Sequence, residues 1–131
     1  MQTTQDQIES FFGEVIYSYT RAQALEDGVL VDVSTEAAAF GFLYPTAISA
    51  AAFEIVQEIP AGSGHTSLGR LRDVLFMAHR AIKKAKESDG SRLAFQLYLD
   101  GALEEITELF IDFGPGDEAE PVLTIGFLTD F

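Results

Sequence analysis

The chain has 131 residues, 21 acids, eight bases and no cysteine, which gives a formal net charge of −13 at pH 7. The lack of cysteine excludes disulfides and thiolate metal sites. An apolar fraction of 47% with 11 Phe excludes global disorder, because disorder needs low hydrophobicity as well as high charge. The polar start predicts no signal peptide, and no apolar run reaches the roughly 18 residues of a membrane span. We expect one cytoplasmic domain over residues 1–131.

Short elements bounded by caps and glycines are predicted in the first third. Thr20 has the side chain of a helix N-cap, and Gly28 is placed to end that helix. Ser34 or Thr35 is expected to cap the next helix. The predicted elements are a helix at 5–12, an extended piece at 14–19, a helix at 21–27, a strand at 29–33 and a helix at 36–40.

Two longer helices are predicted in the middle of the chain. After Pro45, the apolar residues recur at the i, i+3, i+4 spacing and predict a helix over residues 46–59. A glycine-containing loop follows at residues 60–65. Thr66 or Ser67 then starts the longest helix, which is expected to run to about Glu87 with an apolar stripe along one side.

From Arg92 the apolar period changes from helical to alternating. Three strands are predicted, at residues 93–99, 106–113 and 121–128, and the tetrad GPGD at 114–117 fits a type II turn. Short links between successive strands favour an antiparallel meander. We therefore predict an α+β fold in which N-terminal helices (residues 1–91) pack on a three- to four-stranded antiparallel sheet (residues 92–131).

The charges are unevenly distributed along the chain. Residues 66–92 hold seven of the eight bases, whereas residues 93–131 hold nine acids and no base. Such a surface favours a cationic partner, for example a groove that normally binds nucleic acid. Direct nucleic-acid binding is not expected, because phosphates would be repelled by the net charge.

Residues that could support catalysis are few. His65 and His79 stand 14 positions apart without a zinc-site spacing, and neighbouring acids do not form a glycosidase pair or a calcium loop. We expect no catalytic residue, no metal and no cofactor. Residues 62–69, with Arg70 and Arg72 just beyond them, are an alternative anion or ligand site at a helix N-terminus.

The segment YTRAQALEDGVLVDV at residues 19–33 resembles a domain-of-unknown-function family of small acidic proteins common in bacterial phages, plasmids and other mobile elements. The resemblance continues at residues 36–45, at 69–78 and at 114–125. In the last of these, Glu118-Ala119-Glu120 stands where many relatives have a glycine in the loop.

The resemblance implies a non-catalytic inhibitor of bacterial defence, of the anti-CRISPR or anti-restriction type. Its partner would be a basic bacterial protein, either a nuclease or a CRISPR effector subunit, and its acids would mimic DNA phosphates. Seven carboxylates of the last third form the predicted patch: Glu104, Glu105, Glu108, Asp112, Asp117, Glu118 and Glu120.

Two other functions stay open at this point. One is sequestration of a small, nucleotide-like molecule by the loop at 62–69 with Arg70 and Arg72. The other is an oligomeric accessory module, such as a homodimer, that would pair through an exposed apolar edge near the C-terminus. That edge would consist of Val122, Leu123, Ile125, Phe127, Leu128 and Phe131.

Overall fold

The computed structural model describes residues 19–59, 61–85, 92–98 and 106–131. The helix predicted at 5–12 and, except for Tyr19, the extended piece predicted at 14–19 lie outside these residues. The described elements, in chain order, are α2 (Arg21–Glu26), β1 (Leu30–Asp32), α3 (Ser34–Ala38), β2 (Thr46–Ser49), α4 (Ala50–Gln57), α5 (Ser67–Lys84), β3 (Arg92–Tyr98), β4 (Ile106–Pro115), β5 (Pro121–Gly126) and the 3₁₀ helix η1 (Leu128–Asp130).

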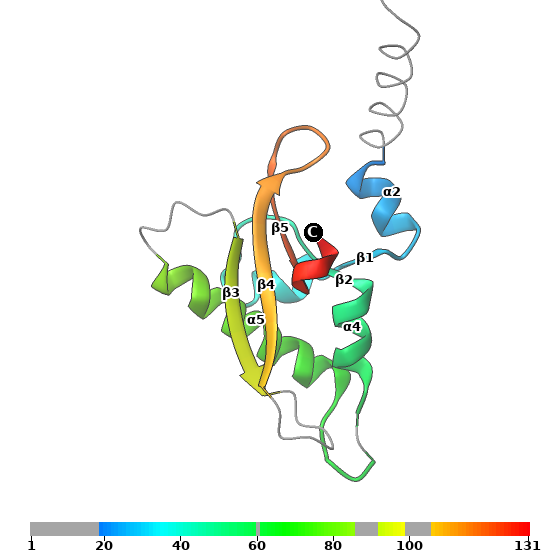
Figure 1. Ribbon diagram of the computed structural model, residues 1–131, viewed down its shortest axis with the longest axis vertical. Helices are drawn as coiled ribbons and strands as arrows, with labels where there is room; N and C mark the ends of the chain where they lie inside the picture. The colour runs from blue at the N-terminus through cyan, green and yellow to red at the C-terminus, as the bar shows by residue number, and fades with distance from the viewer. Residues whose placement is uncertain (1–18, 60, 86–91, 99–105) are drawn as a thin grey trace, which may run out of the picture.

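The α+β class is confirmed, but the predicted meander is wrong. In the described part of the chain the sheet has five strands in the order β1-β2-β5-β4-β3, as Figure 1 shows in part. The β2–β5 pair is parallel and the other three pairs are antiparallel, so the sheet is mixed. Two of its strands come from the segment predicted to be mainly helical, and β5 lies inside the sheet between β2 and β4.

The predicted helix at 46–59 is in fact a strand followed by a helix. Residues Thr46–Ser49 form β2, and Ser49 then caps α4 by accepting a hydrogen bond from the Ala52 amide at 3.2 Å. All four residues of β2 are buried, so the strand lacks the alternation of buried and exposed residues by which a strand is recognised in a sequence. An apolar run of this kind continues into the helical pattern without a break, which is why its spacing alone predicts helix.

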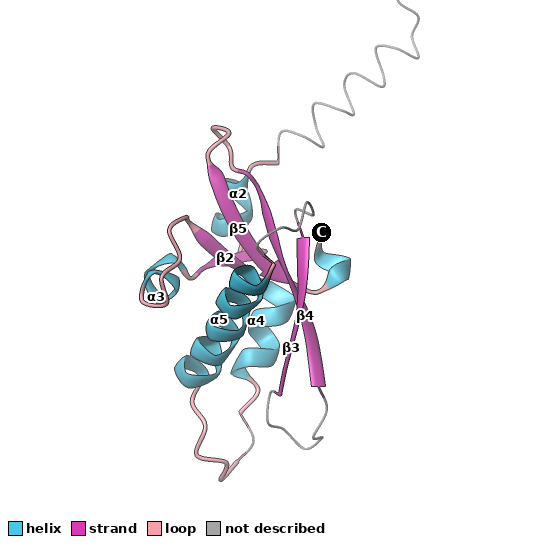
Figure 2. Cartoon of the chain, turned by 90° about the vertical axis from the view of Figure 1, so that its left-hand side faces the viewer, coloured by secondary structure: helices cyan, strands magenta, loops and turns pink. Residues whose placement is uncertain are grey.

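One face of the sheet carries the core and the longer helices. α5 lies along this face (Figure 2), and its cap is the predicted Thr66, which accepts from the Gly69 amide at 2.9 Å. The helix is described to Lys84. The core joins α5 to α4 and to the inner side of the strands through Leu71, Val74, Leu75, Ala78, Val56, Ile48, Phe95, Leu109, Ile111 and Ile125.

The opposite face of the sheet, which we call the outer face, carries two short elements. α2 lies beside β1 at one end of the sheet. Its limits agree with the prediction, because Thr20 forms a capping box with Gln23 and Gly28, just beyond the helix, has φ +77°. η1 lies over the middle of the sheet near the C-terminus (Figure 1). Asp130 fixes it by accepting hydrogen bonds from Ser49 Oγ at 2.7 Å and from the Phe127 amide at 2.7 Å.

The hairpin between β4 and β5 turns later than predicted. β4 runs through Pro115, and Gly116 donates to the carbonyl of Glu120 while Ala119 donates back to Gly116. Ala119 has φ +64°, the left-handed conformation that glycine usually supplies. A Cβ on Gly116 would meet the carboxyl group of Glu120, so that side chain would have to move to accept any other residue there.

Candidate interaction surface

The predicted acidic patch divides into separate groups. Glu104 and Glu105 lie outside the described residues. Glu108 is exposed on the outer face, 3.4 Å from Gln96 Nε2 on the neighbouring strand, and Asp112 forms an ion pair with Arg92 at 3.2 Å. Since Glu108 and Asp117 are nine residues apart along an extended hairpin arm, they are separated by roughly 30 Å at 3.4 Å per residue. They do not form a common surface.

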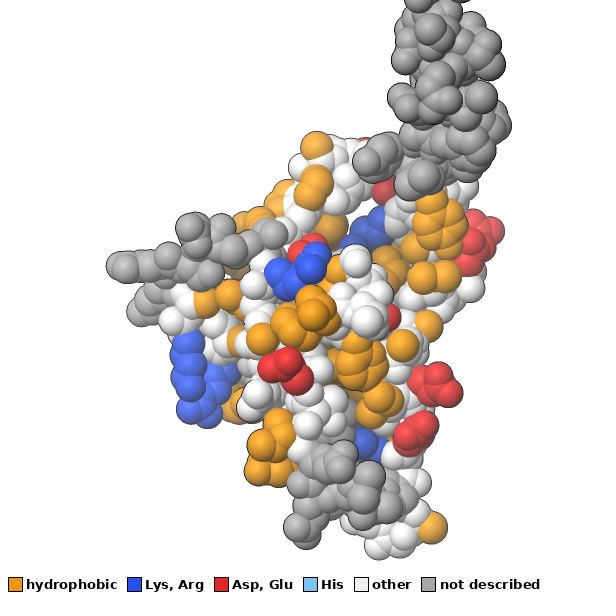
Figure 3. Space-filling model, in the orientation of Figure 1, with side chains coloured by type: hydrophobic (Ala, Val, Ile, Leu, Met, Phe, Trp, Pro, Cys, Tyr) orange, Lys and Arg blue, Asp and Glu red, His pale blue; other side chains and the backbone are white. Residues whose placement is uncertain are grey.

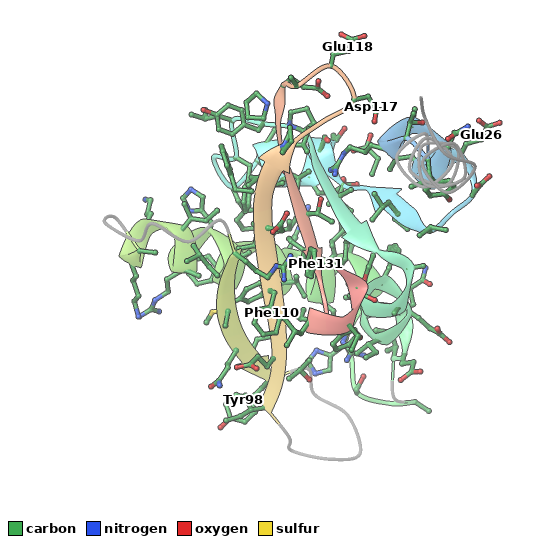
Figure 4. All side chains as sticks on the ribbon, turned by 45° about the horizontal axis from the view of Figure 1, so that its top comes forward. Glu26, Tyr98, Phe110, Asp117, Glu118 and Phe131 are labelled. Carbon is green, nitrogen blue, oxygen red and sulfur yellow. The ribbon has the colours of Figure 1, made fainter. Side chains whose placement is uncertain are left out.

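The remaining three acids, Asp117, Glu118 and Glu120, gather with acids from α2 and β1. Figure 4 shows Asp117, Glu118 and Glu26 at one end of the molecule. Asp27 follows Glu26 directly, and Asp32 ends β1. In the space-filling view, acidic side chains over β3 and β4 stand apart from those near α2 (Figure 3). We call this group the acidic end; it consists of Glu26, Asp27, Asp32, Asp117, Glu118 and Glu120.

Asp117 joins the β4–β5 hairpin to α2. Its two carboxylate oxygens accept hydrogen bonds from the amides of Arg21 at 2.7 Å and Ala22 at 3.0 Å. These amides belong to the first turn of α2, which has no acid of its own. A carboxylate is favoured there because the amides lack helical partners and carry a partial positive charge. The contact spans 96 residues of sequence and holds the hairpin against the helix.

Arg21 is the base at the centre of the acidic end. Its guanidinium donates to Thr124 Oγ1 at 2.7 Å and to the Leu123 carbonyl at 2.8 Å, so the side chain lies against β5. Partial burial lowers the pKa of Arg21, while Asp32, Asp117 and Glu120 act in the opposite direction. Three carboxylates therefore act on one guanidinium that is already bonded to the sheet, and the acidic end as a whole keeps a surplus of negative charge.

Several of these acids have structural roles that the sequence analysis missed. Asp32 accepts hydrogen bonds from the amide and hydroxyl of Ser34, and Glu120 accepts from the amide of Glu118 at 2.8 Å. Asp27 accepts from the hydroxyl of Tyr19, and this bond raises the pKa of Tyr19. The Asp-Gly pair at the end of α2 could have indicated a local bond, but the meeting of the acids of residues 26–32 with those of residues 117–120 depends on a tertiary contact, the one between Asp117 and α2.

The two arginines of the alternative ligand site at residues 62–69 differ in exposure and do not face a common surface. Arg70 is buried, and its guanidinium donates to the carbonyl of Glu58 at the end of α4. It therefore links α5 to α4 and does not face the loop surface. Arg72 is exposed on α5.

The C-terminal segment does not form the predicted edge. Val122, Leu123 and Ile125 are buried, and β5 has a hydrogen-bonded neighbour on each side. The prediction of an exposed edge in this segment is therefore wrong for β5. Phe131 lies on the outer face, where the guanidinium of Arg92 stands 4.5 Å from its ring centroid, near Phe110 (Figure 4).

A cavity of about 360 Å³ opens between α5, the sheet and residues 41–44. Its wall is mainly apolar. Tyr44 and Phe113 form an edge contact with ring centroids 5.6 Å apart, and His79 contacts the ring of Phe42 in the same way. His79 is the one titratable group besides Tyr44 among the described lining residues. A cavity with this lining suits a small apolar molecule.

The described part of the chain was found to hold neither a candidate metal site nor a candidate membrane-spanning helix. No group of three or more His, Asp and Glu side chains is placed there to hold a metal ion. Among the same residues, no helix has the length and apolar character to cross a membrane.

Comparison with known proteins gives one family. Residues 8–130 match the model of a family described as "Family of unknown function (DUF6573)". No curated protein and no solved structure matches the chain.

Proposed function

The chain belongs to DUF6573, a family of unknown function, and on that premise we propose that it is a non-catalytic binding protein for a basic surface. The acidic end would meet Lys and Arg side chains of a partner protein. The observation that carries this proposal is the gathering of Asp32, Asp117 and Glu120 near Arg21, at the end of the molecule that also presents Glu26 and Glu118.

The acidic end has two properties that favour binding. Asp32, Asp117 and Glu120 are held in place by backbone hydrogen bonds, so ordering them on association costs little entropy. Glu26 and Glu118 are exposed, and no ion pair within the described residues involves them. Fixed acids would set the orientation of the partner, and exposed acids would accelerate its approach.

The partner class that this surface suits best is a protein with a cationic nucleic-acid groove. A surplus of carboxylates at one end of a compact molecule presents charge much as a short run of phosphates does. We further propose that the chain originates from a mobile element and counters host defence, with a nuclease or a CRISPR effector subunit as its target. This finer part is supported by the resemblance of residues 19–33 to proteins of phages and plasmids.

The test is inhibition of DNA cleavage by a panel of purified restriction enzymes and CRISPR effectors. We expect one of them to be inhibited at low salt and less at high salt. The double variant Glu26→Lys/Glu118→Lys should weaken inhibition at least tenfold, about 1.4 kcal/mol. The matched control is Glu54→Lys/Glu58→Lys, which changes the net charge equally on exposed positions of α4 and its end. Equal loss in both variants would show that only net charge matters and would contradict a role for the acidic end.

The apolar cavity supports a second candidate function, the binding of a small molecule. The cavity can hold a ligand of modest size, and its lining predicts a mainly apolar one rather than a nucleotide. A thermal-shift screen of aromatic and aliphatic compounds would reveal it, because a ligand that binds only the folded state raises its stability. The variant Leu93→Gln, which places an amide in the cavity wall, should abolish the shift.

A further inference from the structure

The edge strand β3 has an unpaired side. It ends the sheet, with β4 on one side and no strand of the described residues on the other. After Arg92 its sequence is LAFQLY, which has no charge and no proline. Edge strands that do not pair usually carry charges, prolines or bulges, because their free amide and carbonyl groups invite another strand. The β3 edge has none of these protections over six residues.

Helix α5 crosses behind β3 (Figure 1), and a groove opens between the two elements at this edge. The residues of α5 that line the groove lie on one side of the helix, between Asp73 and Lys84. The groove has two hollows of about 420 and 500 Å³. The first is lined by Asp73, Phe76, Met77, Gln96, Leu97, Tyr98 and Ile106, and the second by Met77, Arg80, Ala81, Lys84, Ala85, Leu93, Ala94, Phe95 and Gln96.

The two hollows differ in chemistry. In the first, Phe76, Tyr98 and Ile106 are 53%, 68% and 52% exposed, which is unusual for large apolar side chains that face one another across a groove. In the second, Arg80 and Lys84 have no ion-pair partner among the described residues. Lys and Arg side chains are visible along the β3 margin in Figure 3. The groove is therefore apolar at one end and basic at the other.

We propose that this groove binds an extended segment of a partner protein, which adds to β3 as a further strand. Backbone hydrogen bonds would come from the free edge, and side chains at alternate positions would point into the groove. The segment would place an apolar side chain in the first hollow and a carboxylate at Arg80 and Lys84. On β3 the first hollow is lined by residues 96–98 and the second by residues 93–96, so the two side chains would stand about two to four strand residues apart.

A second copy of this chain suits the groove less well than a single strand. The C-terminal end of α5 projects past β3 on the side away from β4 (Figure 1). If two β3 strands paired about a two-fold axis, the α5 helices of both chains, each with Arg80 and Lys84, would come to the same edge. A single extended strand that carries a carboxylate avoids bringing these like charges together. The groove also lies at the opposite edge of the sheet from β1 and α2, so it is independent of the acidic end.

The experiment is selection of a displayed library of random dodecapeptides on the full chain. We expect the enriched peptides to share a large apolar residue and an Asp or Glu two to four positions away. The double variant Arg80→Glu/Lys84→Glu should weaken binding of the best peptide at least tenfold. Arg72→Glu/Lys83→Glu is the matched control, since it reverses two exposed charges of α5 outside the groove. It should change binding less than threefold.

A second measurement separates strand addition from binding by charge alone. The bound peptide should slow hydrogen exchange of β3 amides, because free edge groups become bonded. The proposal is overturned if no peptide is enriched, if basic peptides are enriched, or if both double variants lose binding equally. It is also overturned if protection appears elsewhere than β3. A dimer of the chain that competes with the peptide and is lost in Arg80→Glu/Lys84→Glu would assign the groove to a second copy and would overturn the proposal as well.

Discussion

The acidic end and the β3 groove use charge in opposite ways. At the acidic end, Asp117 and Asp32 are bonded to backbone amides, so part of their charge stabilises the fold. In the groove, Arg80 and Lys84 have no such partner in the described residues and contribute little to the fold. A count of charges along the sequence therefore does not tell which of them are bonded within the fold and which are free to contact a partner. Stability measurements can distinguish the two kinds, because only the first should matter for folding.

The largest effect is expected from Asp117→Ala. This change removes two hydrogen bonds to the first turn of α2 and the contact that holds the hairpin against the helix. We expect the free energy of unfolding to fall by about 2 kcal/mol, the upper range for loss of a helix cap. Urea denaturation followed by circular dichroism would measure it. Glu118→Ala, one residue away and exposed, is the control and should change stability by less than about 0.5 kcal/mol.

Arg21→Met should have the next largest effect. Methionine preserves much of the side-chain volume but loses the bonds to Thr124 Oγ1 and to the Leu123 carbonyl. We expect a loss of about 1.5 kcal/mol, because hydrogen bonds from a charged donor contribute more than neutral ones and the site is only partly buried. If Arg21→Met were as stable as the parent chain, Arg21 would be a surface charge and not an anchor of α2. The same urea titration distinguishes these outcomes.

The anchor at Arg21 and Asp117 also shows what the sequence could and could not reveal. Thr20, Gly28 and the long apolar stripe of α5 act locally, so the limits of α2, the start of α5 and the approximate positions of β3, β4 and β5 follow from spacing. β2 was missed because a fully buried strand that runs into a helix has no period of its own. The acidic end was only partly predicted, since the contact between Asp117 and α2 joins residues 96 positions apart.

A smaller effect, in the stabilising direction, is expected from Ala119→Gly. Ala119 has φ +64°, and a Cβ in the left-handed region costs roughly 1–2 kcal/mol. Glycine removes this strain but loses more entropy on folding, so the net gain should be about 0.5 kcal/mol. Gly116→Ala is the contrasting variant: its Cβ would displace the Glu120 carboxylate from the Glu118 amide and would lie 3.0 Å from Val122 Cγ1, so it should destabilise the same hairpin. An equal response of the two variants would mean that the turn tolerates either residue and that φ at position 119 is unimportant.

The smallest effect should come from Arg80→Gln/Lys84→Gln. Both side chains are exposed and unpaired among the described residues, so folding should lose only their interaction with the C-terminal end of α5, about 0.5 kcal/mol or less. Urea denaturation of this variant next to Asp117→Ala compares the two regions directly. A loss as large as that of Asp117→Ala would mean that the bases of α5 are bonded within the chain. The groove would then have no free cations for a carboxylate. If instead the loss is small while binding of the selected peptide falls, the charges of the groove serve recognition and those at Asp117 serve the fold.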